Sequence, residues 1–92
     1  MKRFTYKVPE GKLIKIQVSV NENQIQDIVI TGDFFLHPEE CILRIEEKLR
    51  GCNTDEEKIL ETITEAIASM DAKLIGASVN DFTFAILQAI ES

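Results

Sequence analysis

The sequence predicts an α+β fold, in which a three-stranded antiparallel sheet (β-β-β) is followed by three helices packed on one of its faces. Three observations support this prediction. Apolar and polar residues alternate through the first third of the chain, apolar residues recur at helical spacing after residue 37, and short turn sequences separate the alternating runs. We expect strands at about 3–8, 13–20 and 25–31, and helices at about 38–50, 55–70 and 79–91. All of them are expected to form one domain, residues 1–92.

The strands are recognised by apolar residues two apart. In the first strand these are Phe4, Tyr6 and Val8, after which Pro9 and Gly11 supply a turn. The second strand has the strongest alternation and is expected to bury Ile14, Ile16, Val18 and Val20. The third strand is expected to place Ile28 and Ile30 on the buried face. The opposite face of the sheet is mixed and partly apolar, which makes it a candidate partner surface; it is expected to hold Leu13, Lys15, Gln17, Ser19, Ile25, Asp27 and Val29.

The helices are recognised by apolar residues three and four apart and by signals at their ends. Pro38 suits the first position of a helix, and Gly51 is typical of a helix stop. Thr54 and the residues that follow it form a capping-box sequence, TDEE, at the start of the second helix. The sequence SVND, residues 78–81, repeats this pattern at the start of the third helix.

The composition restricts the classes of function. Hydrophobic residues make up 45% of the chain, as is typical of a folded domain. The net charge of −6 disfavours sequence-independent binding to nucleic acid or to anionic membranes, because both require clustered Lys and Arg. No apolar run follows the basic residues near Met1, and none is long enough to cross a membrane. We therefore expect a cytoplasmic protein.

Few side chains could carry out chemistry. Cys41 and Cys52 would lie about 16 Å apart along a helix, beyond the reach of a disulfide, so two free thiols are expected. Cys41 is either a core residue or a reactive thiol at a helix start, where the helix dipole lowers a thiol pKa. His37 either caps the helix that begins at Pro38 or acts as a general base oriented by Asp33. With one His and no paired Cys motif, no metal site is expected.

The segment ITGDFFLHPEE, residues 30–40, joins the last strand to the first helix. Phe34 and Phe35 are adjacent, so in an extended chain they point in opposite directions and one of them can enter the core. Asp33 is placed to accept backbone N–H groups at this corner. The residues alone leave two interpretations open: a structural corner, or a binding surface on which an exposed aromatic lies beside an acid.

Residues 11–51, GKLIKIQVSVNENQIQDIVITGDFFLHPEECILRIEEKLRG, resemble the C-terminal accessory domain of lipoate–protein ligases. In that family a Gly-Lys-Leu-Ile strand leads into a strand that ends in Thr-Gly-Asp-Phe-Phe. A helix then starts at Pro-Glu-Glu and ends at a Gly, which is Gly51 here. Gly76 and the cap at residues 78–81 are also similar, so the resemblance covers nearly the whole chain.

The resemblance implies that this chain assists a reaction performed elsewhere. Ligases of this family use ATP to convert lipoate to lipoyl-AMP. They then transfer the lipoyl group to a lysine of a lipoyl domain on 2-oxoacid dehydrogenase complexes or on the glycine cleavage H protein. ATP, Mg and lipoate are bound by the catalytic domain, which is not among these 92 residues. The resemblance therefore implies no catalytic, cofactor-binding or metal-binding residue on this chain.

The start at Met1 suits the form in which the accessory domain is a separate subunit, so a heterodimer with a catalytic subunit is expected. We expect Asp33, Phe34, Phe35 and His37 to face that subunit. Two other functions remain open: a sulfur-transfer or cluster-assembly partner acting through Cys41, and a generic acidic protein-interaction module.

Overall fold

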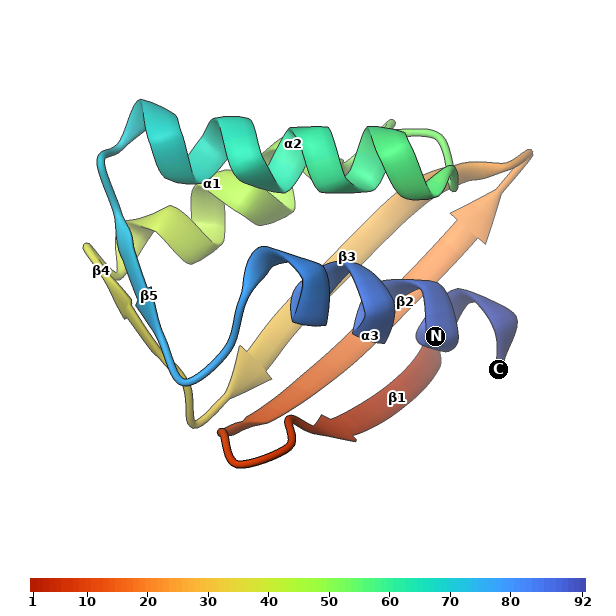
Figure 1. The fold of residues 1–92 in the computed structure, drawn as a ribbon. Helices are drawn as coiled ribbons and strands as arrows, with labels where there is room; N and C mark the ends of the chain where they lie inside the picture. The colour runs from red at the N-terminus through yellow and green to blue at the C-terminus, as the bar shows by residue number, and fades with distance from the viewer.

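The computed structural model describes residues 1–92 and contains the predicted elements together with two further short strands (Figure 1). The elements are β1 (Lys2–Lys7), β2 (Leu13–Asn21), β3 (Gln24–Gly32), β4 (Phe35–His37), α1 (Glu40–Leu49), α2 (Glu56–Ser69), β5 (Lys73–Ile75) and α3 (Val79–Glu91). Strands β1, β2 and β3 form an antiparallel sheet in that order, and the three helices lie on one side of it. The predicted α+β class is confirmed.

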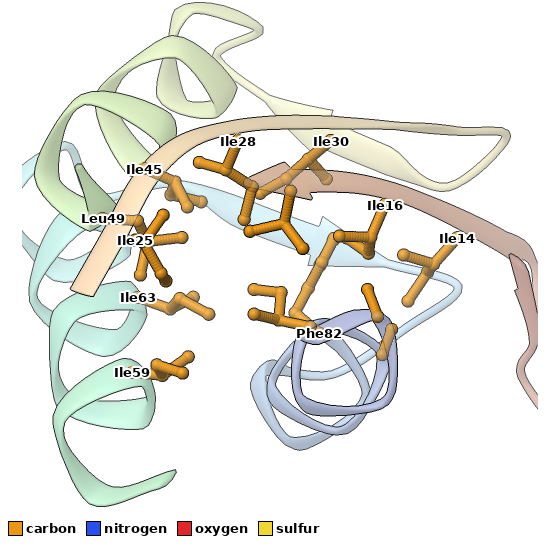
Figure 2. Packing of buried hydrophobic residues seen from close by; sticks show 14 of the residues in the cluster. Ile14, Ile16, Ile25, Ile28, Ile30, Ile45, Leu49, Ile59, Ile63 and Phe82 are labelled. Atoms are coloured by element: carbon orange, nitrogen blue, oxygen red, sulfur yellow. The ribbon is translucent and has the colours of Figure 1, made fainter. Parts of the chain in front are cut away.

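One hydrophobic core fills the space between the sheet and the helices. Figure 2 shows Ile45 and Leu49 of α1 beside Ile25 of β3, with Ile59 and Ile63 of α2 close to them. All five side chains are at most 1% exposed. Burying an isoleucine or leucine side chain contributes about 1.5–3 kcal/mol, so this cluster is a main source of stability. Phe82 of α3 fills the other half of the core, against β2.

The prediction that Ile25 of β3 lies on the face of the sheet opposite the core is wrong. The pairing of β2 with β3 shifts register between Ser19 and Val20, so that Val18 pairs with Ile28 but Val20 pairs with Ile25. This irregularity turns Ile25 into the core, where it is 0% exposed. A bulge of this kind inverts the facing of the residues beyond it, and alternation alone cannot reveal it.

The first helix begins later than predicted, and His37 does not cap it. Helix α1 starts at Glu40, and Glu39 occupies the N-cap position without a capping bond from its side chain. His37 instead lies in β4, and a cis peptide bond links it to Pro38. The extended β4 therefore takes His37, the residue that the sequence pattern assigned to the helix cap.

The other two helix starts differ in how well the sequence predicted them. At α2 the N-cap is Asp55 rather than Thr54, and its carboxylate accepts the N–H of Lys58 at 3.3 Å. At α3 the predicted capping box is confirmed: the Ser78 hydroxyl accepts the Asp81 N–H at 3.2 Å, and the Asp81 carboxylate accepts the Ser78 N–H at 2.9 Å. No helix of the structure has the length and apolar character needed to span a membrane.

Strands β4 and β5 form a two-stranded ribbon that the sequence did not predict. Phe35 pairs with Ile75, Leu36 with Leu74 and His37 with Lys73. Figure 1 shows this ribbon at the end of the molecule away from both chain termini. The ribbon joins the β3–α1 connection to the α2–α3 connection, so it fixes the conformation of the corner described below.

Candidate functional site

The corner after β3 requires a glycine and is held by Asp33. A Cβ atom on Gly32 would lie 2.1 Å from the carbonyl oxygen of Leu13, and the φ of Gly32 is +155°. The next residue, Asp33, accepts the Leu13 N–H at 2.5 Å through its Oδ1 and donates its own N–H to the Leu13 oxygen at 3.2 Å. The end of β3 is thereby bound to the start of β2, and the Asp33 side chain has a structural role.

Phe34 and Phe35 face in opposite directions, as predicted. Phe34 is half-buried and packs edge-on against Phe82, with ring centroids 4.9 Å apart. Phe35 is 48% exposed, and its ring stacks with His37 at a centroid distance of 6.2 Å. Phe34 thus anchors the corner in the core, and Phe35 is the aromatic side chain that a partner could reach.

Phe35 belongs to an exposed surface that two distant segments build together. Its partner across the ribbon is Ile75, which is 61% exposed, and His37 is paired with Lys73. We call Phe35, His37, Lys73 and Ile75 the corner patch. Exposed Phe and Ile side chains on neighbouring strands, with polar side chains beside them, are typical of a protein-binding surface.

A hollow of about 360 Å³ opens beside Phe35. Its walls come from the end of β3, from β4 and from the first turns of α1; they are formed by Ile30, Thr31, Gly32, Phe34, Phe35, Leu36, Glu39 and Ile42. The lining is mainly apolar. A side chain of a partner bound to the corner patch could enter this hollow and lose its contact with water there, which is how interface anchors contribute most of their energy.

The residues predicted for the corner do not form a catalytic set. The Asp33 carboxylate bonds a backbone N–H group, and His37 stacks on Phe35 rather than bonding to Asp33. His37 and Asp33 therefore do not form the general-base pair considered from the sequence. No three His, Cys, Asp or Glu side chains converge in a way that could hold a metal ion.

Cys41 is a core residue and not a reactive thiol. It is 0% exposed, and its Sγ lies 3.8 Å from the carbonyl oxygen of Ala66. Burial raises the pKa of the Cys41 thiol, the opposite of the effect expected from a helix dipole. Cys52 is half-buried, and both cysteines are free. The sulfur-transfer interpretation loses the residue on which it depended.

Sequence reasoning missed half of the corner patch. Lys73 and Ile75 were not recognised as part of a strand, because β5 has only three residues. The available signal was the sequence KLIG, residues 73–76, in which two apolar residues follow the end of a helix and precede a glycine. Nothing in the KLIG sequence reveals that it pairs with a segment 40 residues earlier in the chain, as Ile75 does with Phe35.

Residues 3–86 match the family described as "Bacterial lipoate protein ligase C-terminus". A curated relative, "Lipoate-protein ligase A subunit 2" from Thermoplasma acidophilum, is 42% identical over 60 residues, which are 65% of this chain. The match spans 61% of that relative's length.

A solved structure resembles this chain over most of its length. It is described as "Structural analysis of an archaeal lipoylation system. A bi-partite lipoate protein ligase and its E2 lipoyl domain from Thermoplasma acidophilum". The TM-score is 0.74 at 34% identity, covering 92% of this chain and 90% of that chain. The predicted resemblance is confirmed, and the chain belongs to the lipoate–protein ligase C-terminal domain family.

Proposed function

We propose that this chain is the non-catalytic accessory subunit of a two-subunit lipoate–protein ligase. It binds a separate catalytic subunit and is needed for the ATP-dependent conversion of lipoate to lipoyl-AMP, and hence for lipoylation of lipoyl-domain lysines. One observation carries the proposal: a relative 42% identical over 60 residues is described as "Lipoate-protein ligase A subunit 2". The family match over residues 3–86 supports it. The chain is then part of an enzyme only within the heterodimer.

The chemistry belongs to the catalytic subunit in this proposal. ATP, Mg and lipoate bind there, and the acceptors are lipoyl domains of 2-oxoacid dehydrogenase complexes or the glycine cleavage H protein. We place the heterodimer in the cytoplasm, where free cysteines such as Cys41 and Cys52 stay reduced.

The catalytic subunit binds at the corner patch, and Phe35 enters its surface. Of the four residues expected there from the sequence, Phe35 and His37 supply contact area, while Asp33 and Phe34 hold the corner in shape. A rigid surface placed beside the adenylation site can hold a catalytic loop in its closed form. It also keeps water away from the activated acyl group, which would otherwise hydrolyse.

The test is a reconstitution. The chain is mixed with a catalytic subunit that lacks a C-terminal domain, with ATP and with lipoate, and pyrophosphate release is measured with and without the chain. The proposal expects release only when both proteins are present, together with co-elution of the two proteins in gel filtration. Equal release with the catalytic subunit alone would refute the accessory role.

The generic acidic interaction module has no specific observation in its favour, because the family match accounts for nearly the whole chain. The reconstitution separates it from the ligase function, since a generic module would not change pyrophosphate release.

A further inference from the structure

The face of the sheet that points away from the helices is uncovered. Ile14, Ile16 and Val18 of β2 are buried under the helices, so their neighbours Lys15 and Gln17 point to the opposite side. The strand register then defines the rest of this outer face, which includes Arg3, Thr5, Lys7, Lys15, Gln17 and Val29. None of these residues belongs to the corner patch.

Three positive charges gather on the outer face. Lys15 lies directly opposite Thr5, so Arg3 and Lys7, two residues to either side of Thr5, are its diagonal neighbours at about 7–8 Å. All three basic side chains are exposed. Like charges this close repel one another. The Lys7 ammonium donates to the Gly11 carbonyl oxygen, but the Arg3 and Lys15 side chains have no acceptor within the chain to account for their placement.

The acids near this face offset these positive charges only in part. Asp27 is bonded to Arg50 at 2.9 Å, and the Arg50 guanidinium holds the pKa of the Asp27 carboxyl below its usual value. The Asp33 carboxylate bonds the neutral Leu13 N–H and keeps its negative charge beside Lys15, so it offsets at most one of the three positive charges. The outer face is therefore cationic, although the protein carries a net charge of −6. A cationic surface attracts an acidic partner and repels the same cationic surface of a second copy.

The outer face suits a protein better than a nucleic acid. Apolar side chains lie among the charges: Val29 is 36% exposed and Leu13 is half-buried. Three cations can neutralise only about three phosphates, fewer than the 6–10 contacts of a strong nucleic-acid binder. This face also presents no aromatic side chain on which a base could stack.

The outer face also adjoins the corner patch. A shallow hollow of about 380 Å³ on the outer face is lined by Leu13, Lys15, Thr31, Gly32 and Asp33. Thr31 and Gly32 also line the hollow beside Phe35. A protein bound to the outer face would therefore lie next to a catalytic subunit bound to the corner patch.

We propose that the outer face of the sheet transiently docks an acidic surface of the acceptor protein domain that receives the lipoyl group. This inference rests on the proposed function and deepens it. The exposed Phe35 and Ile75 of the corner patch, with the mainly apolar hollow beside them, suit a lasting contact between subunits. Exposed charges instead suit a substrate protein that must arrive and leave in every catalytic cycle. Attraction between opposite charges speeds that arrival.

The test compares charge variants in the reconstituted ligase with a purified acceptor domain. The double variant Arg3→Glu/Lys15→Glu reverses the cationic face, and Arg3→Gln/Lys15→Gln only neutralises it. The matched control, Arg44→Glu/Lys58→Glu, makes the same charge change on exposed residues of α1 and α2. Circular dichroism checks folding, pyrophosphate release without acceptor reports on adenylation, and transfer at varied acceptor concentration gives KM.

We expect the reversed variant to raise the acceptor KM about tenfold at low salt, the neutralised variant to raise it less, and the control to leave it unchanged. The difference in acceptor KM between the reversed variant and the wild type should shrink as salt is added. Pyrophosphate release should stay at the wild-type rate in all three variants. An unchanged KM in the reversed variant, or an equal rise in the control, would overturn the proposal.

Three other outcomes would also overturn it. A loss of pyrophosphate release in the reversed variant alone would assign the outer face to the catalytic subunit. Salt-sensitive binding of the wild-type chain to single-stranded DNA or to anionic vesicles, with no effect on acceptor KM, would assign it to another anion. If the wild-type chain does not stimulate pyrophosphate release at all, the proposed function fails first and the inference fails with it.

Discussion

Glu46 lies on α1 but points toward the sheet instead of the solvent. It is only 8% exposed, and its Oε2 accepts the backbone N–H of Ile30 at 2.8 Å. Strand β3 is the last strand of its sheet, so this N–H has no neighbouring strand to bond. Glu46 thereby satisfies a buried donor and blocks pairing of this edge with another chain.

Replacing Glu46 by Ala should lower the free energy of unfolding by about 1–3 kcal/mol, because the Ile30 N–H would stay buried without a partner. Glu46→Gln should cost less, since the amide oxygen can accept the same hydrogen bond. Urea denaturation followed by circular dichroism measures both changes. Equal stability of the Ala and Gln variants would contradict the assigned role of the hydrogen bond.

Helix α2 shows how a correct sequence motif can be placed one residue away from its true position. Thr54 fits the capping-box pattern, but the structure uses Asp55 as the N-cap. The backbone N–H of Thr54 instead bonds the carbonyl oxygen of Asn23, in the β2–β3 turn, at 3.0 Å. A tertiary contact thus holds Thr54 outside the helix and shifts the capping role to the next acceptor side chain.

Asp55→Ala should therefore destabilise the protein by about 1 kcal/mol, the usual cost of losing an N-cap. Thr54→Ala is the matched control and should change stability by less than about 0.5 kcal/mol, because its side chain makes no capping bond. Thermal unfolding of both variants distinguishes the two positions. A larger loss of stability for Thr54→Ala than for Asp55→Ala would support the N-cap at Thr54 that the sequence predicted.

The β4–β5 ribbon shows what local patterns omit. Long alternating runs predicted β1, β2 and β3 within one or two residues of their observed ends. Strand β5 has three residues, too few to establish a period, and it is defined by pairing with β4. Its residues contribute half of the corner patch, so the sequence could predict only the Phe35 and His37 side of that surface.

The distribution of exposed aromatic residues over the surface permits a direct test of where the partner binds. Phe35 is 48% exposed in the corner patch, and Phe84 is 44% exposed on α3, where its ring packs 4.9 Å from that of Tyr6. The two residues are matched in type and exposure but differ in their surroundings. Phe35 lies beside the hollow of about 360 Å³ at the corner, whereas Phe84 lines a separate hollow of about 280 Å³ between α2 and α3.

Phe35→Ala should weaken the complex with the catalytic subunit by about 2 kcal/mol, or roughly 30-fold in Kd, because an interface anchor is lost. The adenylation rate at low subunit concentration should fall accordingly, while Phe84→Ala should leave Kd unchanged. Isothermal titration calorimetry measures the Kd of the Phe35→Ala and Phe84→Ala variants. A comparable loss of affinity in the Phe84 variant would contradict binding at the corner patch and indicate an interface on α3.

The candidate site was predictable to different degrees at different positions. The corner at Gly32 and Asp33, and the opposite facing of two adjacent phenylalanines, follow from backbone geometry, so the sequence predicted them. Which phenylalanine is buried depends on Phe82, nearly 50 residues away along the chain, and no local pattern contains that information. The facing of Ile25 depended in the same way on a bulge that only the paired strands reveal.

The two ends of the chain lie side by side. The Lys2 ammonium donates to the carbonyl oxygen of Ile90 at 2.6 Å, and the Ser92 hydroxyl donates to that of Arg3 at 3.3 Å. Figure 1 places both ends away from the β4–β5 ribbon. A covalent tether would therefore hold the domain in nearly the same orientation from either end. Gene order in an engineered fusion with the catalytic subunit is then a free choice, limited only by linker length.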